Sequence, residues 1–342
     1  MLAVVKEKAG PGFAFNEVDI PQPGPGEVII KVRAVGICGS DIPIFNGVRA
    51  VPFPLIPGHE FAGEIVEIGE GVSGFNVGDR VAPSLVISCG TCDYCKQGLE
   101  SMCNSLTEIG IHIDGGFADY AKAPAKVLHK LPDQATFVEG ASVDPVASAY
   151  HSVRKANINP ADTVVVFGPG PIGLYALQLA RIEGASKVIM VGAPGDEERL
   201  RIASELGADA VLLSRDQEEL LKQIRDLTGG KMADVVIEAT GVPEVFATCL
   251  EAVRKEGRIG LTGVFHRSTE VLLSQIVKKE ITVRGSFCYT WLEFGTCLNL
   301  IATGKVRIDN IVSHRLPLRE MGTALEMLNR KEALKIVLEP EV

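Results

Sequence analysis

The stretch TVVVFGPGPIG, residues 163–173, joins a run of apolar residues to three glycines spaced as G-x-G-x-x-G. The apolar residues predict a buried strand, and the residues after the second glycine predict the start of a helix. In such a turn Gly168 allows the tight bend, Gly170 lets the backbone approach a pyrophosphate, and Gly173 lets the helix pack against the strand. The stretch therefore predicts the first β-turn-α unit of a dinucleotide-binding sheet, and Pro171 and Ile172 complete its set of cofactor-binding residues.

Apolar strands and amphipathic helices alternate from about residue 160 to residue 287. We expect strands at 163–167, 187–191, 210–213, 234–238, 258–261 and 281–286, and helices at 172–183, 197–206, 217–227 and 244–254. Strands that are apolar throughout and are separated by helices are typical of a parallel sheet with helices on both faces. The pattern predicts a doubly wound, six-stranded parallel sheet.

The chain has a different character before residue 145. This part is rich in β-branched residues, interrupted by Gly and Pro, and strands are expected at 27–35, 64–68 and 80–81. Short strands with frequent turns predict a compact, mostly β, barrel-like domain. A helix at 292–303 and a strand at 335–338 follow the predicted parallel sheet. The length of 342 residues exceeds what one hydrophobic core usually supports, so two domains are expected.

Composition and charge exclude several functional classes. The chain is 46% hydrophobic and 23% charged, as in ordinary globular proteins, with a net charge of −9 and a pI near 5.3. An acidic surface repels a phosphate backbone, so no nucleic-acid partner is expected. No secretory signal opens the sequence and no apolar run is long enough to span a membrane, so a cytoplasmic, reducing location is expected, without a membrane partner.

Four of the eight cysteines lie close together, at Cys89, Cys92, Cys95 and Cys103. Four thiolates at this spacing can surround one tetrahedral zinc ion and leave no open position, which is the arrangement of a structural site. The residues between them are polar, so the segment would have no core without a metal ion. An iron–sulfur cluster is the alternative, although nothing else in the sequence indicates electron transfer.

A second candidate metal site is dispersed over Cys38, His59 and Glu60. A thiolate, an imidazole and a carboxylate would leave one position on zinc open, as catalytic sites do. Spacing alone does not establish this site, because a single Cys and a single His are more often packed residues. His112, His129, His151, His266 and His314 are interpreted as structural or surface residues.

An ordered series of motifs resembles the zinc-containing medium-chain alcohol and polyol dehydrogenases, in particular the branch of sorbitol, threonine and 2,3-butanediol dehydrogenases. The motifs are GICGSD at 36–41, PGHEFAG at 57–63, GVSGFNVGDRV at 71–81, the four-cysteine segment at 89–103, DGGFADY at 114–120, GPGPIG at 168–173 and EATG at 238–241. The resemblance implies a GroES-like catalytic domain made of residues 1–145 and 289–342, and a Rossmann domain at 146–288. It also implies a homo-oligomer, either a tetramer or a dimer.

The resemblance further assigns residues to a catalytic zinc site. It implies zinc ligands at Cys38, His59, Glu60 and Asp144. Asp144 precedes Pro145 and could instead cap a helix, and its short side chain could reach zinc only through water. Asp41 corresponds to the acid that orients His59, and Ser40 to the hydroxyl that contacts the substrate oxygen. The resemblance thus implies that zinc acidifies an alcohol whose hydride passes to nicotinamide.

Two departures from the family pattern bear on mechanism and substrate. Many relatives carry His where this chain has Pro43, so the proton relay must end at the cofactor ribose or at water. Sorbitol dehydrogenases carry Phe-Arg-Tyr near the substrate, whereas this chain has Phe-Cys-Tyr at 287–289. A buried polyol needs paired hydrogen-bond partners, so a smaller diol, a secondary alcohol, an amino alcohol or another sugar alcohol remain open as substrates.

The sequence predicts the nicotinamide cofactor less sharply than the metal sites. An NAD site usually has Asp or Glu after the second strand, and this chain has Gly192 there. Arg199 could pair with the 2′-phosphate of NADP, but three acidic residues precede it, and Asp196 could reach the ribose or cap the next helix. We expect two zinc ions per chain and NAD or NADP, with NAD slightly favoured, and we place Gly192, Arg199 and Val264 at the cofactor site.

Two other functional classes remain as alternatives. One is a zinc-independent NAD(P)H reductase of the same fold, which would not need Cys38 and His59. The other is a nucleotide-sensing or interaction protein, which would bind the cofactor without turning over an alcohol. Both are expected to be distinguished from a zinc-dependent dehydrogenase by activity and metal content.

Overall fold

A computed structural model describes residues 1–341 and divides the chain into two compact units. Unit 1 comprises Met1–Pro145 and Tyr289–Val342, and unit 2 comprises Val146–Cys288. Within the described residues, no helix is both long and apolar enough to cross a membrane.

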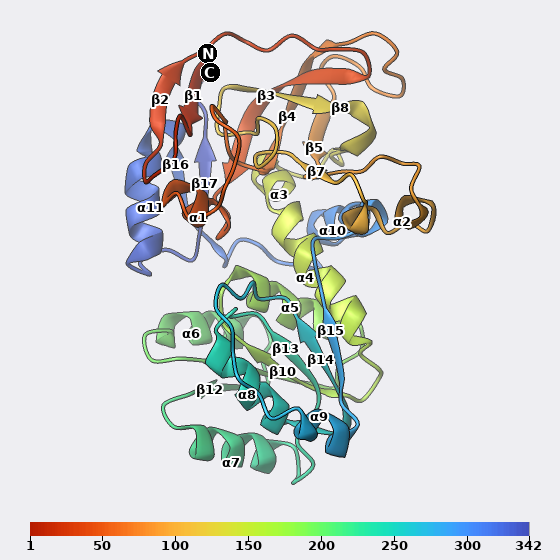
Figure 1. Cartoon of the computed structure of the whole chain (residues 1–342), viewed down its shortest axis with the longest axis vertical. Helices are drawn as coiled ribbons and strands as arrows, with labels where there is room; N and C mark the ends of the chain where they lie inside the picture. The colour runs from red at the N-terminus through yellow and green to blue at the C-terminus, as the bar shows by residue number, and fades with distance from the viewer. Residues whose placement is uncertain (342) are drawn as a thin grey trace. The chain divides into compact units, whose positions relative to one another are not determined.

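Unit 2 is built on the predicted six-stranded parallel sheet (Figure 1). Its strands are β10 (Thr163–Phe167), β11 (Lys187–Gly192), β12 (Ala210–Leu213), β13 (Ala233–Glu238), β14 (Val253–Leu261) and β15 (Thr282–Gly285). Its helices are α4 (Val143–Ala156), α5 (Pro171–Ile182), α6 (Glu197–Glu205), α7 (Gln217–Leu227), α8 (Pro243–Ala252) and α9 (Ser274–Lys279). The first turn of α4 belongs to unit 1. The strand order β12-β11-β10-β13-β14-β15 is the 3-2-1-4-5-6 order of a Rossmann sheet. The fold class predicted from sequence is confirmed.

The central strands of this sheet are apolar because helices cover both of their faces. Val164, Val165 and Val166 of β10 are fully buried, as are their neighbours along β11 and β13. Every neighbouring pair of strands is parallel, so the carboxyl ends of all six strands lie at one edge of the sheet. Loops that follow the strands, including the glycine turn after β10, therefore gather at that edge.

Unit 1 contains a larger, mostly antiparallel sheet, in which one pair of strands is parallel, and several short elements. Its strands are β1 (Leu2–Val5), β2 (Ala14–Glu17), β3 (Glu27–Gly36), β4 (Glu60–Ile68), β5 (Arg80–Pro83), β6 (Val86–Ile87), β7 (Thr107–Glu108), β8 (Tyr120–Pro124), β9 (Leu128–Lys130), β16 (Val312–Pro317) and β17 (Lys335–Glu339). Its helices are α1 (Asp41–Phe45), α2 (Asp93–Lys96), η1 (Glu100–Met102), η2 (Ala125–Val127), α3 (Phe137–Ala141), α10 (Trp291–Ala302), η3 (Leu318–Glu320) and α11 (Met321–Asn329). The strand order is β16-β17-β3-β4-β5-β9, and β8 pairs with β3.

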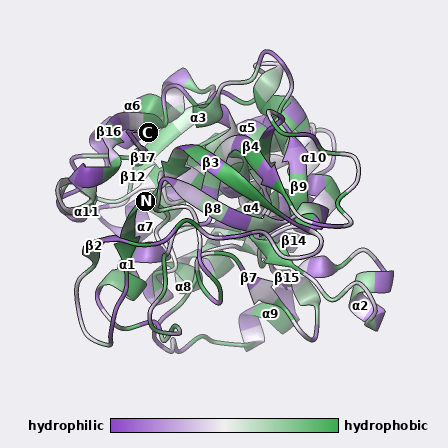
Figure 2. Ribbon diagram, turned by 90° about the horizontal axis from the view of Figure 1, so that it is seen from above, coloured by the Kyte–Doolittle hydropathy of each residue, from purple (hydrophilic) through white to green (hydrophobic). Residues whose placement is uncertain are grey.

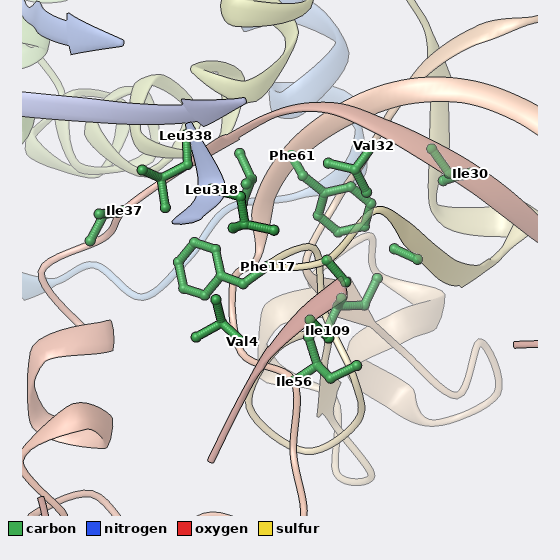
Figure 3. Close-up of a cluster of buried hydrophobic side chains, with 14 of the residues drawn as sticks. Val4, Ile30, Val32, Ile37, Ile56, Phe61, Ile109, Phe117, Leu318 and Leu338 are labelled. Carbon is green, nitrogen blue, oxygen red and sulfur yellow. The ribbon is translucent and has the colours of Figure 1, made fainter. Parts of the chain in front are cut away.

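Strand β3 is the centre of unit 1, because it pairs with β4, β8 and β17. Most of its residues are apolar and buried, and they appear green in Figure 2. Around it, side chains from β1, β4, β17 and the loops form one apolar core, in which Phe61 and Phe117 are the largest members (Figure 3). This core fixes the end of β3 that leads into the candidate metal site.

Several elements differ from the prediction. Strand β4 begins at Glu60, four residues before the predicted start, and β14 begins at Val253, where the sequence predicts the end of a helix. Strand β16 and helix α11 were not predicted. Helix α11 has no side-chain N-cap, and β16 is only partly buried, so neither carries the local signals on which a sequence prediction depends.

The sequence left open that Asp144 and Asp196 cap helices, and neither side chain caps a helix in the structure. Helix α4 begins at Val143, so Asp144 and Pro145 lie inside its first turn, and the pair is not an N-cap followed by a first-position proline. Asp196 does stand at the N-cap position of α6, but its side chain makes no capping hydrogen bond. The Asp144 carboxylate instead accepts a hydrogen bond from the Tyr289 hydroxyl, and the Asp196 carboxylate accepts one from the backbone N–H of Ala193.

His129 is a buried ring in unit 1, as expected for a structural histidine. It lies on β9, with its ring centroid 4.4 Å from that of Trp291 and 4.7 Å from that of Phe294. Its Nε2 atom has no hydrogen-bond partner in the described structure. Burial disfavours the charged ring and lowers the pKa of His129 to about 4.

We predict that His129 makes unit 1 sensitive to mild acid. Since the unfolded ring titrates near pH 6.5 and the folded ring near 4, stability is full above pH 6.5 and falls by up to about 1.4 kcal/mol per pH unit down to pH 4. The His129→Phe variant should flatten this slope in urea unfolding measured from pH 7.5 to 4.5. A His266→Phe control, at an exposed position, should keep it; equal slopes in all three proteins would refute the assignment.

Candidate functional site

The predicted catalytic ligands come together where β3 ends and β4 begins. Gly36, the last residue of β3, is the partner of Glu60, the first residue of β4. Cys38 follows β3 in the turn that leads into α1, and His59 precedes Glu60 directly. One ligand atom from each of Cys38, His59 and Glu60 lies within 4.8 Å of the others, so the three side chains could hold one metal ion.

Three buried polar atoms at this cluster have no hydrogen-bond partner in the described part of the chain: His59 Nδ1, Glu60 Oε1 and Asp41 Oδ1. Buried polar groups in folded proteins are almost always satisfied, and each orphaned one costs about 1–3 kcal/mol. A cation held by Cys38, His59 and Glu60 would satisfy Glu60 Oε1, while His59 Nδ1 and Asp41 Oδ1 face each other at 3.9 Å. The donor types match zinc, which binds sulfur, nitrogen and carboxylate oxygen.

Asp41 is fully buried at the start of α1, where it connects two of the ligands. Its Oδ2 accepts a hydrogen bond of 2.8 Å from the backbone N–H of Cys38, and its Oδ1 lies 3.9 Å from Nδ1 of His59. Burial raises the pKa of Asp41 despite the opposing effect of His59. The distance to His59 is that of an ion pair and is too long for a hydrogen bond, so the structure places Asp41 beside the imidazole that it is expected to orient.

The surroundings of His59 favour positive charge. Burial alone would lower the pKa of His59, but the negative charges of Cys38, Asp41 and Asp144 outweigh it and raise the pKa well above its ordinary value. The same negative charges stabilise a divalent cation at this position.

Lys335 completes the site and was not predicted from the sequence. It is the first residue of β17, it is buried, and its Nζ donates to Glu60 Oε2 and, at 2.8 Å, to the carbonyl of Ile37. Burial opposes its charge, but Glu60 and Cys38 outweigh this effect and raise the pKa of Lys335. A side chain at Gly36 would collide with Glu60 Oε2 at 2.3 Å, so glycine makes room for the pair.

Asp144 lies near the cluster without belonging to the group of three. Its Oδ2 accepts a hydrogen bond from the hydroxyl of Tyr289, which in turn accepts one of 3.3 Å from the backbone N–H of Leu85. Burial and the nearby Glu60 raise the pKa of Asp144 to about 7, against the opposing effect of His59. Tyr289 is fully buried, and its role toward Asp144 was also missed by the sequence analysis.

Ser40 occupies the N-cap position of α1, between Cys38 and Asp41. Its side chain makes no capping hydrogen bond, and the residue is only partly buried. A hydroxyl at this place is therefore not committed to the helix, which suits the expected contact with a substrate oxygen.

The four predicted cysteines of the structural site also converge. Their ligand atoms lie within 4.8 Å of one another, and Sγ–Sγ distances are 3.4 Å for Cys92–Cys95 and 3.9 Å for Cys89–Cys95. Backbone N–H groups donate to the sulfurs, which lowers the pKa of Cys89 to about 5, with the N–H of Thr91 as the largest cause. Helix α2, which carries Cys95, has no buried residue, so apolar packing does not hold this segment together.

The glycine turn after β10 has the geometry that a bound pyrophosphate requires. Gly168 has φ +99°, and a Cβ on Gly173 would lie 1.9 Å from the carbonyl oxygen of Gly168, so both positions need glycine. A Cβ on Gly170 would point into open space, which leaves the backbone accessible there. Pro171 begins α5, so the amino end of a 12-residue helix faces this space.

The other predicted cofactor residues lie at the same edge of the sheet in unit 2. Gly192 ends β11, Arg199 is in the first part of α6, and Val264 follows β14 in an exposed loop. A Cβ on Gly241 would lie 2.6 Å from the carbonyl oxygen of Val264, so the loops after β13 and β14 pack closely. The structure therefore gathers every predicted cofactor residue at the carboxyl ends of the strands.

The two sets of residues define a class of protein: a dinucleotide-binding oxidoreductase with a metal site in a separate β domain. Comparisons with known proteins agree. Residues 24–133 match the family model of the alcohol dehydrogenase GroES-like domain, and residues 171–303 match that of the zinc-binding dehydrogenases. The chain belongs to the zinc-containing medium-chain alcohol dehydrogenase family, and it is an NAD(P)-dependent alcohol or polyol dehydrogenase.

Individual relatives span the whole chain. A sorbitol dehydrogenase of Halalkalibacterium halodurans is 38% identical, with 99% of each chain covered. An L-threonine 3-dehydrogenase of Pyrococcus horikoshii is 36% identical over 92% of this chain and 91% of its own. Among solved structures, an alcohol dehydrogenase from Thermus sp. ATN1 has a TM-score of 0.92 at 33% identity, with full coverage of both chains. A 2R,3R-butanediol dehydrogenase from Bacillus subtilis has a TM-score of 0.91 at 30% identity, with 99% of each chain covered.

We predict that Lys335→Met will destabilise unit 1 strongly. Removing one partner of a buried ion pair leaves the Glu60 carboxylate uncompensated, and the expected loss is about 3–5 kcal/mol in the free energy of unfolding, measured by urea denaturation. The double variant Glu60→Gln with Lys335→Met removes both charges and should regain most of this loss. A Lys335→Met protein that unfolds at the wild-type urea concentration would show that the pair is not a stabilising contact.

Proposed function

We propose that this protein oxidises a secondary hydroxyl of a small diol or polyol with NAD, using a zinc ion held by Cys38, His59 and Glu60. Supporting this is the group of thiolate, imidazole and carboxylate, in which the buried atoms His59 Nδ1 and Glu60 Oε1 have no hydrogen-bond partner in the described structure. Unit 1 is then the catalytic, zinc-binding domain and unit 2 the dinucleotide-binding domain.

A zinc ion at this cluster supplies a Lewis acid that lowers the pKa of an alcohol, and nicotinamide accepts the hydride. Ser40, whose hydroxyl caps no helix, takes the alcohol proton and passes it outward. Because Pro43 replaces the histidine that continues the relay in many relatives, the proton leaves to the cofactor ribose or to water. Asp41 keeps the Cys38 backbone and the His59 ring in place while the charge of the substrate changes.

Glu60 and Asp144 have distinct proposed roles. Lys335 holds one carboxylate oxygen of Glu60 and leaves Oε1 directed to the cluster, so Glu60 ligates through Oε1. Oδ2 of Asp144 accepts a hydrogen bond from the Tyr289 hydroxyl, and Asp144 lies outside the group of three candidate ligands. Asp144 would therefore act on a bound zinc ion from outside the ligand set, in line with its short side chain.

We further propose a second zinc ion at Cys89, Cys92, Cys95 and Cys103, where four sulfurs leave no place for substrate. This ion would stabilise a segment that has almost no apolar core of its own. The proposal thus includes two zinc ions per chain and NAD as the cofactor. It also includes a cytoplasmic location and a homo-oligomer of two or four chains.

The substrate proposal depends on the segment 287–289. Cys288 stands where sorbitol dehydrogenases carry Arg, so a long polyol would lose a charged hydrogen-bond donor in this segment. Tyr289 retains its hydroxyl, but Asp144 and Leu85 already engage it. A short substrate with one or two neighbouring hydroxyls needs fewer such partners than sorbitol does.

We predict that metal analysis of the purified protein will find two zinc ions per chain. Cys38→Ser should lose one ion and essentially all alcohol oxidation, while Cys95→Ser should lose the other ion and unfold more easily. Cys249→Ser is a matched control, because this buried cysteine of unit 2 lies outside both clusters. A Cys38→Ser protein that retains full activity would favour the zinc-independent reductase.

The substrate assignment is tested by a screen of short diols, secondary alcohols, polyols and L-threonine with NAD and NADP, monitored by absorbance of the reduced cofactor. We expect kcat/KM for a four-carbon vicinal diol to exceed that for sorbitol by at least about 10-fold, since buried unpaired hydroxyls cost binding energy. Preference for L-threonine would redirect the proposal to an amino alcohol, and no turnover of any alcohol would refute it.

A further inference from the structure

The second strand of the sheet in unit 2 ends without the acid that usually binds the ribose of NAD. Gly192 holds that position. A Cβ built there would lie 3.1 Å from Cβ of Asp196 and 3.1 Å from Cγ of Leu200, closer than ordinary contact. The space next to residue 192 is thus already taken by Asp196, so an acid at 192 could not be added without displacing it.

The Asp196 carboxylate is held at the end of β11. Although the residue stands at the N-cap position of α6, its side chain does not cap the helix. Its Oδ2 accepts a hydrogen bond of 3.0 Å from the backbone N–H of Ala193, the first residue after β11, and Asp196 is only 7% exposed. This anchoring keeps a negative charge beside the strand end where the ribose of a dinucleotide lies.

The turn that contains Asp196 has no spare backbone donor for a phosphate. The N–H of Ala193 is used by Asp196, and Pro194 has no N–H. The N–H of Gly195 donates to Glu197 Oε2 at 2.9 Å, and the N–H of Asp196 donates to the carbonyl of Ala193 at 3.0 Å. A 2′-phosphate at this turn would therefore meet the like charges of the Asp196 and Glu197 carboxylates.

Arg199, which the sequence suggested as a partner for that phosphate, is oriented toward Asp196. Its Nη1 atom lies 3.8 Å from Asp196 Oδ1, within one turn of α6. The positive charge that could attract a phosphate is thus shared with a carboxylate of the chain. A neutral ribose carries hydroxyls, which can donate hydrogen bonds to a carboxylate.

We propose that Asp196 is the residue that selects NAD over NADP in this protein. Its carboxylate takes the place of the missing acid at residue 192, accepts the ribose hydroxyls of NAD and repels the 2′-phosphate of NADP. The inference rests on the proposed use of NAD, and it names the residue responsible.

The test is binding of the reduced cofactors to the zinc-loaded protein, followed by nicotinamide fluorescence without any alcohol. Wild type should bind NADH at least about 100-fold more tightly than NADPH. Asp196→Ser removes the charge but keeps a hydroxyl for the N–H of Ala193, and the preference for NADH should fall at least about 30-fold. Adding Arg199→Gln to Asp196→Ser should lower any NADPH affinity gained, because the Arg199 guanidinium no longer shares its charge with the Asp196 carboxylate in the single variant.

Glu198→Gln is the matched control, since it removes an equal charge from the same first turn. The Glu198 side chain is exposed and pairs with Arg201 at 2.6 Å, away from the Ala193 turn. The preference of the Glu198→Gln variant for NADH over NADPH should stay within about 3-fold of that of the wild type. The inference is overturned if wild type binds both cofactors equally, or if Asp196→Ser shifts the preference no more than Glu198→Gln.

Circular dichroism and zinc content show whether each variant is folded, and Asp196→Asn provides a nearly isosteric second variant. It should also lose preference for NADH, because its amide carries no charge. The fluorescence measurement requires no turnover. A failure of the proposed alcohol oxidation would therefore leave the binding result intact, and the two failures can be distinguished.

Discussion

The candidate metal site depends on how the negative charges of Cys38 and of the buried Asp41 and Glu60 are compensated. Carboxylates transferred out of water are costly unless they are paired or bind a cation. The ammonium of Lys335 compensates Glu60 from one side, and a metal ion at the cluster would compensate the other. The pairing of Gly36 with Glu60 places all of these groups at one end of a largely buried pair of strands in unit 1.

This arrangement explains why the site lies at a strand end and not on a loop. Strand β3 is fixed on both sides, by β4 and β17, and each neighbour contributes one member of the Glu60–Lys335 pair. The ligand Cys38 follows β3 by two residues, so little conformational freedom remains. A metal site supported in this way is preorganised, and the entropy lost on binding the ion is small.

Much of the fold and of the site could be predicted from the sequence, because both carry local signals. The strand before Gly168 and the helix after it are encoded by adjacent residues, and they define the dinucleotide-binding turn. The clusters at Cys89 and Cys38 could be named from their spacing and from the family motifs. In contrast, Lys335 lies 275 residues from Glu60, and no local pattern distinguishes it from a surface lysine at the start of a strand.

Tyr289 and Asp196 show two other reasons why prediction is incomplete. Tyr289 is read from sequence as one member of a substrate segment, but its hydroxyl is engaged by Asp144, which only tertiary packing reveals. Asp196 has the sequence context of a helix cap, and local propensity favours that role. In the structure the Asp196 carboxylate accepts a hydrogen bond from the N–H of Ala193, in the turn after β11, and does not cap α6.

The two metal clusters of unit 1 differ in a way that follows from their surroundings. Four sulfurs in a solvent-exposed segment fill every position of a tetrahedral ion, so such an ion stabilises the segment and reacts with nothing. The cluster at Cys38 offers three ligands in a buried place, with a carboxylate beyond them and an uncommitted hydroxyl at Ser40. An ion held there would leave a position for an alcohol oxygen, and the weak screening of the interior would make its charge effective. Burial and an incomplete ligand set thus separate a site for chemistry from a site for stability within the same β domain.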